Sequence, residues 1–474
     1  MPIQENIKIY IDVTEDQINT ELTDTLMDLH EPIVANRFKI LEDYYKGNHE
    51  ILSRVIEEDK PNNKPITNFC SYITDTLTGF FVGKPVSYTS TDKEYLNILT
   101  DIFEDSDEQA ENHDLAHKAS IKGQSYELVY QDEEGNTCFQ SLDTDGVIMV
   151  YDTSIKSKPS MAMRYFKVYN YITLDYYIKI DVYTKTNIYH YTQEGATTEL
   201  DSQEPHYFGE VPIVEFENNR YCRGDFENII TLNNMYNKNT ADISNDIEYF
   251  SNCYLGITGA EGTTADDIKV IKENRTIILP VGGSAGFITK QINDSCVQNH
   301  RDNLAEDIHK TAYVPDLSKE INSNVSGSAL KTKMFTTADI IVNKERKFKK
   351  ALQTRIRLIT KMLNLKGYKK DGANIKTHDY NYKDIAINFH RNMPVGLFET
   401  ADDIAKMSTV VTKKTLLTEI GIEDVQAELD GLDGESNSMV DLNSLHNDVT
   451  PTDATPTIDT TVKPVDTTVK TNGQ

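Results

Sequence analysis

The stretch GDFENIITLNNMYNKNTADISNDIEYFSN, residues 224–252, decides the architecture of this chain. No proline and no internal glycine interrupts the run from Gly224 to Tyr254, which predicts one helix of about 45 Å at 1.5 Å per residue. Its apolar residues form a thin seam, and asparagine and aspartate cover the remainder. Because such a helix cannot bury itself in a core, we expect it to pack against copies or neighbours and to turn a wide polar face to water.

A glycine-rich insertion follows this helix, LGITGAEGTTADDIKVIKENRTIILPVGGSAGFITK, residues 255–290. Its pattern predicts a small helix at the centre with strand-like flanks. A second helix is expected from about Cys296 to Tyr313. The two helices would bracket the insertion as a stalk carries a tip.

The residues before this stalk predict helices followed by a sheet. Thr14 and Gln17 form a capping-box pattern that predicts the start of a helix, and a second helix should begin near a proline and end at Gly47. Residues 60–83 begin with a proline and asparagine turn and continue as NFCSYITDTLTGFF, whose apolar spacing suits a buried helix. GKPVSY then suits a short strand, and residues 92–122 suit further helix. From there to about Glu217, short alternating segments rich in Tyr, Val and Ile predict an all-β module.

The residues after the stalk begin with SGSALKTKMFTTADIIVNKERKFKKALQTRIRLITKML, a third long helical region in which TTADIIV predicts a kink or loop. From Lys344 to Lys370 there are eleven basic residues against one acidic residue, Glu345. A solvated helix face, DNA or an acidic neighbouring subunit would each explain this run. Residues 401–435 suggest short helices, and the Thr, Pro and Asp composition beyond them is typical of a disordered tail.

The composition narrows the class of protein. A net charge of −27 over 474 residues excludes a tight DNA binder, since affinity for DNA comes mostly from Lys and Arg. The acidity suits either a solubilising surface or a channel wall that repels phosphate. Five widely spaced cysteines without a CxxC pair argue against disulfides and structural zinc. No apolar run is long enough for a membrane span, and no signal peptide is recognisable.

No stretch of the chain has a convincing catalytic, cofactor or metal pattern. GFFVGKP (79–85) has three residues between its glycines where a phosphate-binding loop needs four. HDLAH places His113 and His117 one helical turn apart, but the glutamate and the third ligand of a zinc enzyme are missing. DTDG (143–146) matches part of a calcium loop, yet the strand-like VIMVY after it favours a hairpin turn. GGSAG (282–286) lacks the glycine pattern of a dinucleotide site. We therefore expect a non-enzymatic protein without cofactors.

Several segments, read in order, resemble the portal proteins of tailed bacteriophages of the SPP1 type, and the resemblance spans roughly residues 35–430. Their joint order is far more specific than any single segment. They are YYKGNHEIL (44–52), KPNNKPITNF (60–69), DTLTGFFVGKPVSY (75–88), IMVYDTS (148–154), GEVPIVEFENN (209–219), GDFENIITLNNMYN (224–237) and KERKFKKAL (344–352).

The resemblance implies an α+β phage portal fold. It comprises a mixed helix and sheet wing, two long stem helices, a small α/β clip, a long helix after a tunnel loop, and a short helical crown. The expected boundaries are wing 1–223, first stem helix 224–254, clip 255–293, second stem helix 294–314, tunnel loop with long helix and return to the wing 315–400, crown 401–435 and disordered tail 436–474.

The resemblance also implies function and partners. Twelve copies would form a ring at the head-tail vertex of the virion, after assembly in the host cytoplasm, with double-stranded DNA passing through without tight binding. Partners would be the terminase large subunit, a head-completion or adaptor protein, and the major capsid and scaffolding proteins, with no membrane. For the DNA channel we expect Lys331, Lys333 and Lys344, and for docking at the clip Thr263, Thr264, Asp266, Asp267, Lys269 and Lys272.

Two other functions stay open from the sequence. A head-tail adaptor is a different structural protein of the virion, although adaptors are usually much shorter. A DNA-processing enzyme such as a nuclease would need a clustered carboxylate site.

Overall fold

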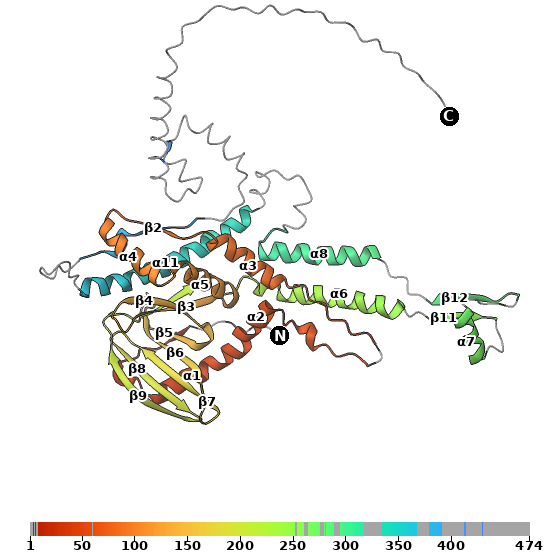
Figure 1. The fold of residues 1–474 in the computed structure, drawn as a ribbon, viewed down its shortest axis with the longest axis horizontal. Coiled ribbons are helices and arrows are strands. Elements are labelled where there is room, and N and C mark those ends of the chain that lie inside the picture. The colour runs from red at the N-terminus through yellow and green to blue at the C-terminus, as the bar shows by residue number, and fades with distance from the viewer. Residues whose placement is uncertain are drawn as a thin grey trace, which may run out of the picture. The chain divides into compact units, whose positions relative to one another are not determined.

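The elements of the fold come from a computed structural model (Figure 1). The chain divides into two compact units, Met1–Pro394 and Val395–Gln474. The helices and strands described below belong to the first unit. Apart from single positions, the expected crown (401–435) and tail (436–474) lie outside the described residues. The continuous described ranges are 8–58, 60–251, 254–259, 264–274, 281–288, 294–316, 334–366 and 379–390.

The first helices differ from the sequence prediction in where they start and stop. The Thr14–Gln17 capping box forms, but it opens only a single 3-10 turn. Helix α1 (Thr20–Ile33) begins later, where the Asn19 side chain accepts a hydrogen bond from the Leu22 amide. Helical geometry then continues past Pro32 through a π-helical turn (Val34–Phe38) into α2 (Lys39–Lys46). The chain stays helical on both sides of Pro32, so the two expected helices are one continuous run.

The next elements follow the predicted pattern. Gly47 ends α2 in the left-handed conformation, with φ of 88°, as expected of a helix terminator. The elements that follow Gly47 are α3 (Phe69–Val82), β2 (Ser87–Thr89), α4 (Lys93–Asp105) and α5 (Glu108–Lys122).

The β-rich module folds into two sheets. The six-stranded sheet has the order β1 (Ile9–Tyr10), β5 (Val147–Tyr151), β6 (Pro159–Asn170), β7 (Asp175–Tyr183), β8 (Asn187–Glu194) and β9 (Thr197–Pro205), antiparallel except for the β1–β5 pair. The three-stranded sheet has the order β10 (Ile213–Glu217), β3 (Gln124–Gln131), β4 (Thr137–Leu142).

The predicted hairpin at DTDG is wrong, because this turn connects two different sheets. Strand β4 pairs with β3, whereas β5 pairs with β1 and β6. The turn itself is a 3-10 turn, Thr144–Gly146.

Strand β5 shows why both faces of the large sheet are apolar. Ile148 and Val150 belong to a core under α1, whereas Val147 and Met149 belong to a core shared with the small sheet. Side chains alternate between the faces of a strand, so the continuous apolar run VIMVY is what a strand buried on both sides requires.

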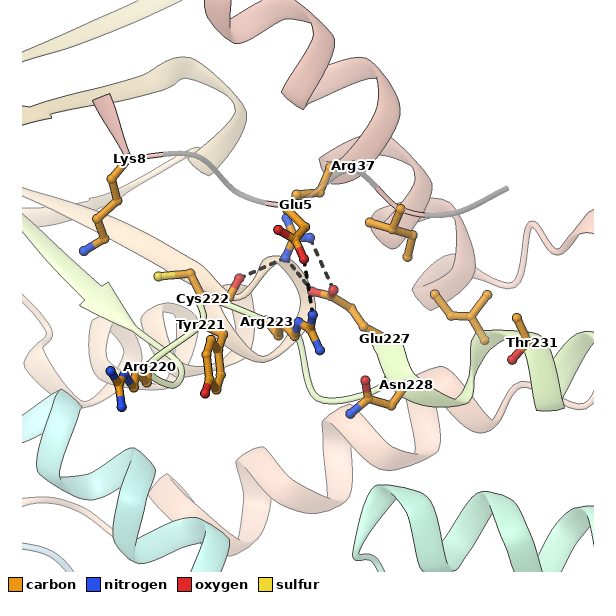
Figure 2. A pocket seen from close by; sticks show the side chains of 12 residues that line it. Glu5, Lys8, Arg37, Arg220, Tyr221, Cys222, Arg223, Glu227, Asn228 and Thr231 are labelled. Atoms are coloured by element: carbon orange, nitrogen blue, oxygen red, sulfur yellow. Dashed lines mark hydrogen bonds and ion pairs between the residues drawn. The ribbon is translucent and has the colours of Figure 1, made fainter. Parts of the chain in front are cut away.

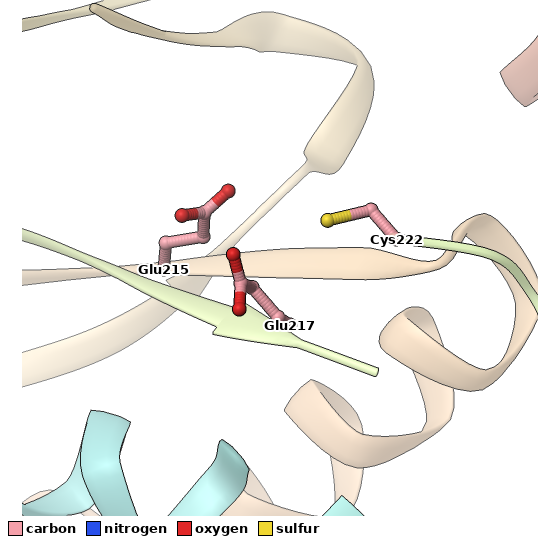
Figure 3. Close-up of side chains that lie close together, drawn as sticks. All are labelled: Glu215, Glu217 and Cys222. Carbon is pink, nitrogen blue, oxygen red and sulfur yellow. The ribbon is translucent and has the colours of Figure 1, made fainter. Parts of the chain in front are cut away.

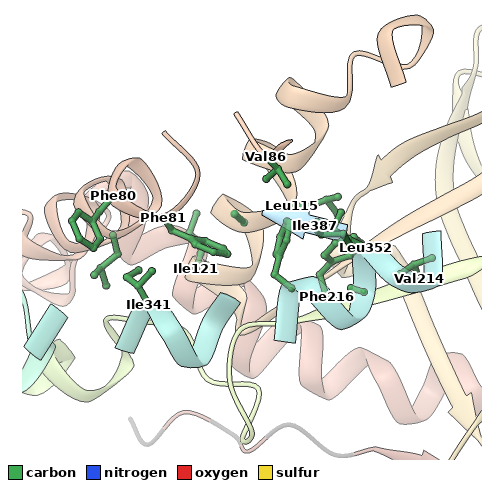
Figure 4. Packing of buried hydrophobic residues seen from close by; sticks show 14 of the residues in the cluster. Phe80, Phe81, Val86, Leu115, Ile121, Val214, Phe216, Ile341, Leu352 and Ile387 are labelled. Atoms are coloured by element: carbon green, nitrogen blue, oxygen red, sulfur yellow. The ribbon is translucent and has the colours of Figure 1, made fainter. Parts of the chain in front are cut away.

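The largest core lies around α11 (Phe335–Lys366), a helix of 32 residues. Figure 4 shows Ile341 and Leu352 of this helix among side chains such as Phe81 and Phe216. The helix includes the TTADIIV stretch, so the loop expected there is not present. A short pair, β13 (Ala386–Asn388) with β2, closes this region.

Both helices expected around the glycine-rich insertion are present in the structure. A 3-10 turn precedes α6 (Ile230–Ser251), so the first helix starts a few residues after Gly224. Helix α8 (Asp294–Ala312) lies beside α6 (Figure 1). Between them in sequence come β11 (Tyr254–Thr258), α7 (Ala265–Asn274) and β12 (Ser284–Ile288), with β11 and β12 paired antiparallel.

Candidate subunit interface and channel elements

The asparagines of α6 form a buried face. Asn233, Asn237 and Asn245 follow one another at spacings of four and eight residues, which places them on one side of a helix. The Asn237 side chain accepts a hydrogen bond from the Thr67 amide at 2.9 Å, and Asn233 donates to the Thr67 carbonyl at 2.8 Å. Asn245 accepts from the Asn63 amide at 2.7 Å.

These hydrogen bonds fix an extended segment, residues 61–68, along α6. Pro61 and Pro65 keep this segment out of helical geometry, so its backbone needs partners from elsewhere. The asparagine side chains supply them, and Asn233 and Asn237 are both 0% exposed. These two asparagines therefore do not face water as expected, whereas Lys238, Asp242 and Glu248 of the same helix are exposed.

Helix α8 is closer than α6 to the predicted helix with a wide polar face turned to water. Leu304, Ile308 and Ala312 are buried at spacings of four residues, and the latter two join the main core. They find apolar partners within one chain, contrary to the expectation that copies supply them. The other faces of α8 carry exposed polar and charged side chains, including Asp302, Glu306, Asp307 and Lys310.

On α6, Met235, Ile247 and Tyr249 remain 51%, 61% and 47% exposed.

The clip residues chosen from sequence include a helix cap. Thr264 donates through its amide and its hydroxyl to the Asp267 carboxylate, at 2.8 and 2.7 Å, just before α7. These hydrogen bonds lower the pKa of Asp267. Thr264, Asp266, Asp267 and Lys269 are exposed, as docking residues must be. Thr263 and the side chain of Lys272 lie outside the described residues.

Of the three lysines expected in the channel, the structure describes one. Lys344 is 6% exposed, and its ammonium forms an ion pair with the Asp225 carboxylate. A buried, paired ammonium cannot meet phosphate, so Lys344 is corrected from a channel residue to a core residue. Lys331 and Lys333 lie outside the described residues.

Much of the basic run of α11 faces the protein itself. Five of its cations, including Lys344, pair with acidic residues of the same chain, because α11 lies against β10 and β3. Arg346 and Lys350 are exposed, as a solvated face would have them. Arg355 is fully buried between Glu127, at 2.5 Å, and Glu108, at 3.4 Å. The remaining pairs are Lys347–Glu217, Arg357–Glu210 and Lys361–Glu210.

Three side chains near β10 have the composition of a metal site. One ligand atom from each of Glu215, Glu217 and Cys222 lies within 4.8 Å of the other two (Figure 3). Lys8 pairs with both glutamates, and Lys347 pairs with Glu217. Burial raises the pKa of the Cys222 thiol to about 12. Two ammonium groups and a protonated thiol make this an internal salt-bridge cluster.

A cavity of about 540 Å³ opens where the chain enters α6 (Figure 2). Its charged lining includes Arg37, Arg220, Arg223 and Glu227. The Arg37 guanidinium pairs with Glu227 at 2.5 Å. Sequence reasoning missed this cavity, although the Arg-Tyr-Cys-Arg run at 220–223 is an unusual basic and aromatic cluster in so acidic a chain.

The structure shows where two of the motifs rejected from the sequence lie. Phe80 and Phe81 of the GFFVG stretch are buried in the last turns of α3. His113 and His117 stack on α5, and His117 Nε2 lies 2.9 Å from the Tyr45 hydroxyl.

No helix among the described residues is both long and apolar enough to span a bilayer.

Comparison with known proteins identifies the family. Residues 30–440 match the model of the family described as phage portal protein, SPP1 Gp6-like. Over 317 residues the chain is 21% identical to the portal protein of Bacillus phage SPP1, covering 63% of this chain and 62% of that protein.

Two solved structures are similar in fold. One is described as the neck of a native GTA particle computed with C12 symmetry (12% identity, TM-score 0.44), the other as the neck of an empty GTA particle computed with C6 symmetry (12% identity, TM-score 0.47). Each likeness covers 74% of this chain and 89% of the solved chain.

The family match defines the class of protein as a structural component of a phage, built here from a mixed α/β body, the α6 and α8 pair, and a small β-α-β unit. The chain belongs to the SPP1-type family of phage portal proteins.

Proposed function

We propose that this chain forms the ring-shaped portal at the head-tail vertex of a tailed phage, through which double-stranded DNA enters during packaging and leaves during ejection. The observation that carries the proposal is membership of the portal family over residues 30–440. In this proposal the α6 and α8 pair would be the stem, and β11, α7 and β12, which lie between them in sequence, would be the clip.

A ring of twelve copies would carry a charge on the order of −300. Such a field disfavours adhesion of phosphate to the wall, so DNA slides rather than binds. Lys331 and Lys333 would steady the duplex near the constriction. Movement would be powered by the motor, so the portal itself needs no catalytic site.

The clip is the proposed docking surface for the terminase large subunit and later for a head-completion or adaptor protein, through Thr263, Thr264, Asp266, Asp267, Lys269 and Lys272. The major capsid and scaffolding proteins would contact the ring during assembly in the host cytoplasm. The chain covers 62% of the curated relative's length, and these partners are part of the proposal.

Negative-stain electron microscopy of the purified chain tests the proposal. Rings with a central hole and a projecting stem are expected. Rings without a stem would favour a head-tail adaptor, and monomers with metal-dependent nuclease activity would favour a DNA-processing enzyme.

A further inference from the structure

The loop between β10 and α6 is held rigid from within. The Asn219 side chain accepts hydrogen bonds from the Tyr221 and Arg223 amides at 3.0 and 3.1 Å, and it donates to the Arg223 carbonyl at 2.6 Å. Asn218 donates to the same carbonyl at 2.8 Å. The loop backbone therefore has one conformation before any partner arrives.

The buried side of the loop is fixed just as firmly. The Cys222 carbonyl accepts a hydrogen bond at 2.9 Å from Arg37, which is 2% exposed. Cys222 has a φ of 49°, unusual for a residue with a side chain. A Cβ on Gly123 would lie 2.0 Å from the same carbonyl oxygen, so glycine permits this close approach. Strained backbone of this kind persists where the surroundings impose it, and it is enriched at binding sites.

The outer side of the loop presents Arg220, Tyr221 and Arg223 at the cavity (Figure 2). Tyr221 is 71% exposed, and both guanidinium groups lie about 6 Å from its ring centre. Within the described part of the chain no carboxylate lies within ion-pair distance of Arg220, and Arg223 reaches Glu5 at 3.7 Å. Arginine and tyrosine on a preorganised surface are the residue types that dominate binding energy at protein interfaces.

We propose that this loop binds an acidic segment of a second copy of the chain. The inference rests on the proposed function, in which copies lie side by side in a ring. Each copy carries 75 acidic against 48 basic residues, so a neighbour presents carboxylates nearly everywhere. The cavity, of about 540 Å³, admits a carboxylate side chain but not a duplex. The contact is heterologous, as a cyclic ring requires.

Charge reversal tests the inference. Arg220→Glu with Arg223→Glu should raise the concentration at half-assembly about tenfold or more in sedimentation velocity at low salt, and high salt should shrink the difference. Lys156→Glu with Lys185→Glu is the matched control, because it changes the net charge equally at two exposed lysines elsewhere. Arg220→Gln alone should give a smaller shift with an unchanged melting temperature.

The outcomes separate the inference from the proposed function. Assembly of the reversed variant at the same concentration as the control overturns the inference and leaves the ring standing. A wild-type chain that stays monomeric at every concentration overturns both.

A photo-crosslinker in place of Tyr221 identifies the occupant directly. Mixed tagged and untagged copies should yield crosslinks between copies, ending on a peptide rich in Asp or Glu. Crosslinks to DNA, or to no second copy in assembled rings, would contradict the inference.

Discussion

Replacing Asn237 with alanine should loosen the extended segment 61–68 without disturbing the rest of α6. The change leaves the Thr67 amide and His49 Nδ1 without the partners they have at 2.9 and 3.2 Å. Only the Thr67 hydrogen bond holds the segment itself, and its loss costs about 1 to 1.5 kcal/mol. This corresponds to roughly tenfold more frequent opening of the segment.

Hydrogen exchange of the peptide spanning 61–68, followed by mass spectrometry, measures this opening. Asn239→Ala is the matched control, because it changes the same residue type on the same helix, and Asn239 makes no side-chain hydrogen bond among the described residues. We expect exchange at the Thr67 amide to accelerate roughly tenfold in the first variant and less than about twofold in the control. Equal exchange in the two variants would refute the assignment of the asparagine face as the support of this segment.

Three further predictions follow from buried groups. Burial lowers the pKa of His30 from its ordinary 6.5 to about 4. As the pH falls, the unfolded chain therefore takes up a proton at this residue before the folded chain does. About 3 kcal/mol of folding stability that is present above pH 6.5 is lost as the pH falls to 4. His30→Phe should remove that part of the pH dependence in denaturant titrations, and an unchanged slope would contradict the shift. Arg355→Met should cost about 3 to 5 kcal/mol, because it leaves Glu127 buried and unpaired; adding Glu127→Gln should recover part of the loss, and strict additivity in this cycle would argue against the pair. Gly123→Ala should cost more than about 2 kcal/mol in thermal unfolding, because its Cβ would meet a carbonyl oxygen at 2.0 Å. Gly135 has a similar φ but open space around it, so Gly135→Ala should cost only about 1 kcal/mol. Equal melting temperatures for the two variants would contradict the steric argument.

The apolar periodicity of the sequence predicted those elements that bury one of their faces. The helices α3, α5 and α8 and the β-rich module lie near the expected positions, because apolar spacing directly reports which side of an element is buried. The start of α1 was misplaced because Thr14 and Asn19 are both suitable caps within a few residues. Local sequence cannot rank two such caps when tertiary packing chooses between them.

The charged residues were harder to place than the apolar ones. Lys344 and Arg355 belong to the same basic run, and nothing in that run indicates that both are buried. Their partners Asp225 and Glu127 lie more than 100 residues away in sequence. Pairing at that separation depends on how α11 lies against the sheet.

The sequence by itself determined most of the order of elements, including the two helices around a glycine-rich insertion, and the portal family, because these depend on local spacing and on motifs in a fixed order. Tertiary structure alone decided that the asparagines of α6 hold a neighbouring segment, that Lys344 is buried, and that Arg220, Tyr221 and Arg223 stand on a rigid loop at a cavity. The physical reason is that a polar side chain is equally suited to water and to a buried partner, and its environment is fixed only when distant parts of the chain meet it.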